Sequence, residues 1–114
     1  MIDVMNILET IKFLVNPERM DELLLKEGLS LDTDVRDFAI YCIGEIDLLA
    51  EIKILSDEET DNDIVYEKDG ISYICFFDIG HAIDLIENDL ELKGKGYSDQ
   101  VIGDRLIEYR INDA

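Results

Sequence analysis

The sequence predicts an α+β fold, with about five helices packed around a small antiparallel sheet that contains a β-hairpin. Two observations carry this prediction. Apolar residues recur at three- and four-residue steps in several segments, and two β-rich runs are joined by Asp69-Gly70. With 114 residues, 47% of them hydrophobic, the chain has material for one core. Residues 1–114 are therefore expected to form a single globular domain.

Two helices are expected near the amino terminus. The first carries apolar residues at helical spacing: Val4, Ile7, Leu8, Ile11, Leu14 and Val15. The second is expected over residues 17–27, because Asn16 can cap it and Pro17 suits the first helical position. Gly28 then offers a left-handed stop.

The same spacing favours a third helix over residues 34–50, with Asp34 as its cap. Its apolar positions are Val35, Phe38, Ala39, Cys42, Ile43, Ile46, Leu49 and Ala50. Two observations oppose a helix. Gly44 lowers helix propensity by about 1 kcal/mol relative to alanine, and the β-branched and aromatic content of residues 38–43 suits a strand equally well. The helical period decides for a helix, and a strand remains the alternative for residues 38–50.

Alternating apolar and polar residues predict the strands of a small antiparallel sheet. They are expected at residues 51–54, 64–67 and 71–77. Asp69 and Gly70 are expected at the centre of a type I′ turn, which requires positive φ at both positions. This turn would place Tyr66 opposite Tyr73 across the hairpin.

Two further helices are expected in the carboxyl-terminal third. One covers residues 79–90 and ends before a loop of alternating lysine and glycine at residues 93–96. The other begins at Ser98, where Tyr97 can pack on Ile102 as a hydrophobic staple. Its apolar stripe consists of Ile102, Leu106 and Tyr109.

The net charge of −18 is concentrated in the middle of the chain. Residues 1–26 carry −2, residues 27–91 carry −16 with 19 acids and three bases, and residues 92–114 are neutral. Five acids crowd one predicted loop, here named the acidic segment (residues 57–63): Asp57, Glu58, Glu59, Asp61 and Asp63. Three more are expected on the outer face of the fourth helix: Asp84, Glu87 and Glu91.

These eight acids are the predicted partner-binding residues. Charge runs often only keep a surface solvated, and that interpretation remains open. However, unbalanced like charge destabilises the compact state, whereas a field of one sign speeds encounter with an oppositely charged partner. The expected partner is therefore a basic protein. Direct binding of nucleic acid is not expected, because phosphate contacts need clustered Lys and Arg, and this chain has ten such residues among 28 acids.

Composition also indicates the compartment. Residues 1–20 contain charged residues among the apolar ones, so neither a signal peptide nor a membrane span is expected there. Cys42 and Cys75 both lie in apolar runs, which favours buried, reduced thiols over a disulfide or a reactive thiol. We expect a cytoplasmic protein that does not associate with membranes.

No pattern in the sequence points to catalysis, a metal or a cofactor. His81 is the only histidine, and Asp99 stands where a dinucleotide fingerprint starting at residue 94 needs glycine. The acidic segment has carboxylates at alternate positions, as in a calcium loop. However, Asn62 replaces the turn glycine and Lys68 replaces the bidentate glutamate. The chain is not expected to be an enzyme.

The carboxyl-terminal run GYSDQVIGDRLIEYRINDA (residues 96–114), with the acidic middle, resembles small bacterial immunity proteins of toxin systems, including contact-dependent growth inhibition. The resemblance covers size, charge and these last residues, and no functional residue is carried over. It implies a compact acidic domain that binds and blocks a cognate basic toxin or nuclease.

Three hypotheses of function follow. The favoured one is an immunity or inhibitor protein, with a nucleic-acid mimic as a subtype. A regulatory or adaptor domain would also bind a protein, but without a toxic partner. A small enzyme or ligand carrier would need a deep pocket with convergent polar groups. The sequence leaves the oligomeric state open.

Overall fold

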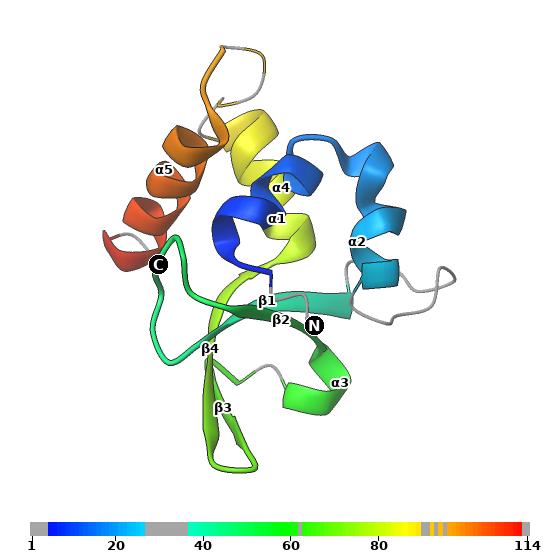
Figure 1. Ribbon diagram of the computed structural model, residues 1–114, viewed down its shortest axis with the longest axis vertical. Coiled ribbons are helices and arrows are strands. Elements are labelled where there is room, and N and C mark those ends of the chain that lie inside the picture. Colours follow the sequence, from blue (N-terminus) through cyan, green and yellow to red (C-terminus); the bar gives the residue numbers. More distant parts are fainter. Residues whose placement is uncertain are drawn as a thin grey trace.

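The computed structural model describes residues 5–26, 37–61, 63–89, 92, 94 and 96–112. Within these residues one antiparallel sheet has the strand order β2-β1-β4-β3 (Figure 1). Its strands are β1 (Phe38–Ile43), β2 (Ile52–Ser56), β3 (Val65–Lys68) and β4 (Ile71–Asp78). The helices are α1 (Ile7–Leu14), α2 (Met20–Lys26), α3 (Asp57–Thr60), α4 (Ile79–Asp84) and α5 (Asp99–Asn112). The α+β class is confirmed.

The first helix forms where the apolar spacing predicts it, and the second, expected from residue 17, is a 3-10 turn over Pro17–Arg19 followed by α2. Helix α1 begins after Asn6, whose side chain accepts a hydrogen bond from the backbone N–H of Glu9 at 2.9 Å. The side chain of Asn16 does not cap the second helix as expected. It donates to the carbonyl oxygen of Lys12 at 3.0 Å and so satisfies the end of α1. Gly28, the predicted stop, lies outside the described residues.

The predicted third helix is wrong over the described part of residues 34–50. Strand β1 occupies Phe38–Ile43 and pairs with β2 on one side and β4 on the other. Its central residues are buried on both faces, so the strand is continuously apolar and matches a helical period by chance. Gly44, at φ 87, ends the strand in a conformation that a helix excludes. Asp34 and Val35 lie outside the described residues.

The two faces of the sheet are covered differently. Helices α1, α2, α4 and α5 lie on one side of the sheet in Figure 1, and α3 lies on the other. The core between the sheet and the four helices includes Ile40 and Cys42 of β1. Tyr41 points to the opposite face because side chains alternate along a strand, yet it is only 1% exposed. Helix α3 and the residues that follow it therefore form a second, smaller layer over Tyr41.

A bulge brings two neighbouring phenylalanines into the core. In the pairing of β1 with β4, Ile40 faces Phe77 whereas Tyr41 faces Cys75, so Phe76 is an extra residue. Phe76 and Phe77 are consequently both buried. Both thiols are free, with Cys42 buried and Cys75 partly buried. Burial raises the pKa of Cys42 to about 11.

The predicted hairpin is confirmed. Strands β3 and β4 pair with Tyr66 opposite Tyr73, and the two rings lie 6.1 Å apart. Asp69 and Gly70 have φ values of 54° and 80°, as a type I′ turn requires. The hairpin projects away from the four helices in Figure 1.

Replacing Gly70 by valine should lower the free energy of unfolding by about 1–2 kcal/mol, because a β-branched residue is strained at positive φ. A built Cβ at Gly70 meets nothing within 4 Å, so steric contact adds nothing to this strain. Urea unfolding would measure the loss. A Gly70→Asn control should be better tolerated, since Asn accepts this conformation. Equal stability of the valine variant and the native protein would contradict the assigned turn.

The carboxyl-terminal helices also form, with one change in winding. Helix α4 runs into a π-helical turn, Leu85–Asp89, so the regular spacing predicted for residues 79–90 does not continue. Helix α5 begins directly after Ser98, close to the predicted start, and the hydroxyl of Ser98 accepts from the backbone N–H of Val101 at 3.2 Å. Within the described residues, no helix is long and apolar enough to cross a membrane.

Candidate functional site

The acidic segment begins as a helix, where the sequence analysis expected a loop. Ser56 caps α3, and its hydroxyl accepts from the backbone N–H of Glu59 at 3.0 Å. Acids in the first turn interact favourably with the free N–H groups of a helix start, which favours this short turn. Asp61 ends the helix in the left-handed conformation at φ 56.

Tyr41 fixes the acidic segment to the sheet. Its hydroxyl donates to the carbonyl oxygen of Asp63 at 2.7 Å and lies 3.1 Å from Oγ of Thr60. Burial raises the pKa of Tyr41, so this hydroxyl stays protonated and remains a donor. Thr60 is 1% exposed, and its own hydroxyl donates to the carbonyl oxygen of Ser56. The acids around this buried contact are therefore held at defined positions.

Glu59 has a role within the chain that the sequence does not indicate. Its carboxylate accepts from the hydroxyl of Tyr66 at 3.3 Å and lies 3.7 Å from Nζ of Lys68. These contacts join α3 to the hairpin. Glu58, Asp61 and Asp63 are exposed. Within the described part of the chain, neither these three acids nor Asp57 forms an ion pair.

A further acidic group lies at one end of the sheet, where three elements bring carboxylates together. Asp37 precedes β1, Asp57 follows β2, and Asp78 ends β4. A hollow of about 380 Å³ is lined by Asp37, Phe38, Ser56, Asp57 and Glu58. The pKa of Asp57 is raised, first by burial and then by the negative charges of Asp78 and Asp37. Asp37 and Asp78 were missed as site residues because only the strand register places them beside Asp57.

Removing the charge of Asp57 should stabilise the protein near neutral pH. With its pKa raised, Asp57 holds its proton more tightly in the folded than in the unfolded chain. Stability is therefore lost as the pH rises through the interval between these two values. We expect Asp57→Asn to raise the free energy of unfolding at pH 7 by about 0.2–1 kcal/mol after solvent screening.

The gain from Asp57→Asn should disappear below the ordinary Asp pKa of 3.8, where the native carboxyl is already protonated. Denaturant unfolding across this pH range measures the effect. Glu58→Gln removes the same charge from an exposed position of the same helix and should give a smaller gain. A pH-independent gain for Asp57→Asn would contradict the electrostatic explanation.

The acids predicted on the fourth helix lie apart from the acidic segment. Asp84 ends α4 and Glu87 lies in the π-helical turn, and both are exposed. Glu91 lies outside the described residues. In Figure 1, α4 and α3 are on opposite sides of the sheet. The two predicted groups of acids are therefore separate surfaces.

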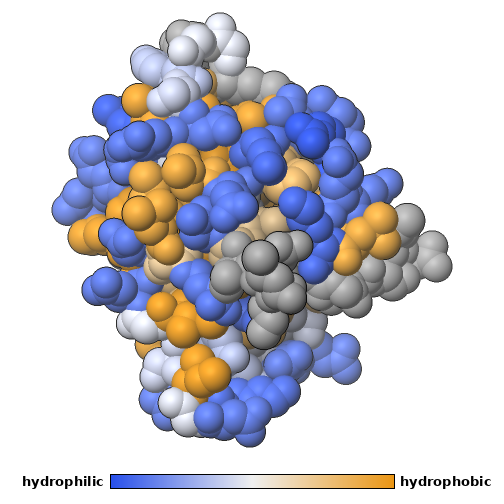
Figure 2. Space-filling model, in the orientation of Figure 1, coloured by the Kyte–Doolittle hydropathy of each residue, from blue (hydrophilic) through white to orange (hydrophobic). Residues whose placement is uncertain are grey.

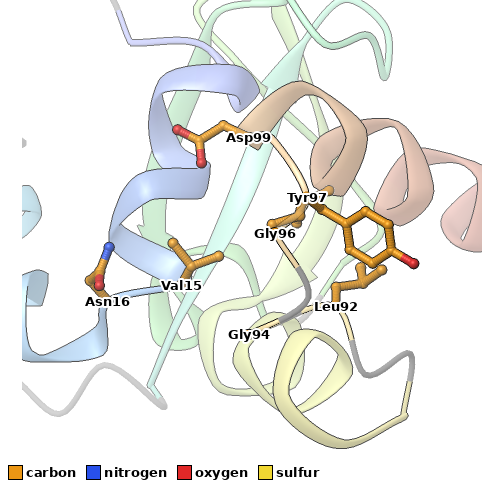
Figure 3. Close-up of a pocket in the computed structure, with 8 residues that line it drawn as sticks. Val15, Asn16, Leu92, Gly94, Gly96, Tyr97 and Asp99 are labelled. Atoms are coloured by element: carbon orange, nitrogen blue, oxygen red, sulfur yellow. The ribbon is translucent and has the colours of Figure 1, made fainter.

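A cavity of about 290 Å³ lies between the end of α1 and the start of α5 (Figure 3). Its lining residues are Val15, Asn16, Leu92, Gly94, Gly96, Tyr97, Asp99 and Ile102. The Tyr97 ring lies beside Leu92 in this view, and Asp99 contributes a carboxylate to the lining. Of the predicted partner-binding acids that the structure describes, none lines this cavity.

The residues that the structure describes contain no group of three or more His, Cys, Asp or Glu side chains placed to hold a metal ion. His81 packs edge-on against Phe77 with ring centres 5.4 Å apart. A comparison of the chain with protein-family models, curated proteins and solved structures found no match.

Proposed function

We propose that this domain binds a basic protein through its acidic segment and blocks it, as an immunity protein blocks a cognate basic toxin or nuclease. The observation that carries the proposal is the fixed position of exposed acids around the buried hydroxyl of Tyr41. A solvated surface loop does not need such an anchor. A binding surface gains from one, because ordered groups lose less entropy on association.

The crowding of acids at the end of the sheet supports the same proposal. Asp37 and Asp78 act on Asp57 with the same sign of charge, and this repulsion destabilises the free domain. A partner's Lys or Arg near Asp57 would relieve the repulsion and lower the raised pKa. Binding near the pKa of Asp57 should then release a proton.

The separation of the two groups of acids refines the predicted interface. We assign direct contact with the partner to the acidic segment, because the hydroxyl of Tyr41 fixes this segment to the sheet through the carbonyl oxygen of Asp63. Asp84 at the end of α4 and Glu87 in the π-helical turn are assigned a weaker contribution, through the long-range field. This field should act mainly on the rate of encounter and should be screened beyond about 8 Å at physiological salt.

The proposal includes a bacterial, cytoplasmic setting. Free thiols at Cys42 and Cys75 fit a reducing compartment. We propose no enzymatic step and no cofactor for the domain. A regulatory or adaptor domain would use the same surface, and differs in leaving its partner's activity intact.

The test is to recover the partner from native cells with the tagged domain and to assay the partner's activity with and without the domain. We expect a basic partner, and an activity that falls to background at equimolar domain. Growth protection of cells that express the partner would support inhibition in the cell. A basic partner whose activity is unchanged would favour the adaptor, and an acidic or neutral partner would overturn the proposal.

A further inference from the structure

Strand β3 is the outermost strand of the sheet on the β4 side. On the other side, β2 is partly covered by the amino-terminal segment. There the backbone N–H of Ile52 donates to the carbonyl oxygen of Met5 at 2.8 Å, and Asn6 forms a bridge with Glu51. Within the described residues, no strand pairs with the outer edge of β3.

The register shows which backbone groups this edge presents. The N–H of Cys75 donates to the carbonyl oxygen of Ile64 at 2.8 Å, and antiparallel pairs alternate between bonded and non-bonded ones. Tyr66 and Lys68 therefore bond to β4, whereas the N–H and C=O groups of Val65 and Glu67 point away from the sheet.

The same edge exposes apolar side chains. Ile64 and Val65 are 64% and 52% exposed, and Ile71, across the hairpin in β4, is 40% exposed. Figure 2 shows hydrophobic surface among hydrophilic residues at the end of the molecule where the hairpin projects. Proteins usually protect such edges by charge, bulges or covering segments, since an open edge pairs with other chains.

The charge around the outer edge of β3 indicates which kind of segment pairs with it. Residues 57–69 contain seven acids and one base, and that base, Lys68, already lies beside Glu59. A second copy of the chain would bring its own acids to the same edge, so repulsion opposes pairing between copies. A basic segment has the complementary charge.

We propose that the outer edge of β3 binds an extended segment of the partner as an additional strand, with an apolar residue opposite Val65 and a Lys or Arg opposite Glu67. This proposal rests on the proposed function and gives its mode of binding. Backbone bonds to Val65 and Glu67 would supply affinity, and the acids would select the charge of the incoming strand.

The test measures amide hydrogen exchange by NMR with a capped peptide of alternating Lys and Val as the probe. In the free protein, the amides of Val65 and Glu67 should exchange faster than those of Tyr66 and Lys68. The peptide should slow exchange at Val65 and Glu67, and a Glu-Val peptide of equal length should not. A concentration-dependent dimer that protects Val65 without any peptide would instead identify a second copy as occupant and overturn the proposal.

Val65→Pro removes one outward N–H without removing a bond to β4, and should weaken peptide binding about five- to tenfold. Contact signals between the rings of Tyr66 and Tyr73 report whether the hairpin persists. If the hairpin is lost, exchange in the native protein remains the deciding measurement. Peptide binding that shifts α3 signals but leaves exchange at Val65 and Glu67 unchanged would overturn strand addition and leave the electrostatic function standing. No binding of the Lys-Val peptide would also overturn strand addition, whereas the proposed function fails separately if the cellular partner is not basic.

Discussion

Replacing Tyr41 by alanine should lower the free energy of unfolding by about 3–5 kcal/mol, the range for large aromatic residues truncated in a core. The side chain is 1% exposed and lies between the sheet and the residues that follow α3. Its loss leaves a cavity and also removes the hydrogen bond that holds Asp63. Denaturant unfolding should show the largest loss of stability among the substitutions considered for this protein.

Tyr41→Phe separates the ring from the hydroxyl. The ring still fills the site, but the carbonyl oxygen of Asp63 loses its donor, at an expected loss of about 1–3 kcal/mol. Amide exchange should then increase at Thr60 and Asp63, while the packing of the core around Ile40 is unchanged. Native exchange at Thr60 and Asp63 in the Phe variant would show that the hydroxyl does not anchor the acidic segment.

The hairpin could be predicted from the sequence because its signal is local. Asp69-Gly70 fixes the turn, and the turn fixes the pairing of Tyr66 with Tyr73. Strand β1 could not be predicted in this way, because a central strand that is buried on both faces lacks the alternation of apolar and polar residues. Its burial depends on α3 and on the four helices across the sheet, which no local window contains.

Part of the candidate site could also be predicted from the sequence, because the signal for that part is local. The charge count finds the acidic segment, since its carboxylates are neighbours in sequence. The contacts of Glu59 with Tyr66 and Lys68 depend on the fold, as does the position of Asp78 beside Asp57. The sequence could not separate the acids on α4 from the acidic segment, because this requires the sides of the sheet to be known.

Neutralising the acidic segment should slow association with the basic partner by about tenfold or more at low salt. The variant combines Asp57→Asn, Glu58→Gln, Asp61→Asn and Asp63→Asn. It retains Glu59, because Gln at that position would leave Lys68 without its carboxylate. Folding should be unchanged or slightly improved, since repulsion falls, and the salt dependence of the association rate should flatten.

In the same experiment, the dissociation rate distinguishes acids that contact the partner from acids that act only through the long-range field. Acids at the rim of an interface act mainly on the association rate. An acid desolvated against a partner's Arg or Lys acts on dissociation and costs about 2–5 kcal/mol when truncated. We expect Asp61 and Asp63 to affect the dissociation rate, because they lie in the segment that joins α3 to β3.

A kinetic comparison of two double variants shows whether the acidic segment contacts the basic partner. The double variants Asp61→Asn/Asp63→Asn and Asp84→Asn/Glu87→Gln each remove two negative charges, one pair from each acidic surface. Rates with the isolated partner are measured at low and physiological salt. We expect slower association and faster dissociation for the first variant, and only a small, salt-screened slowing of association for the second. Rates for both variants equal to those of the native protein at every salt concentration would contradict this contact.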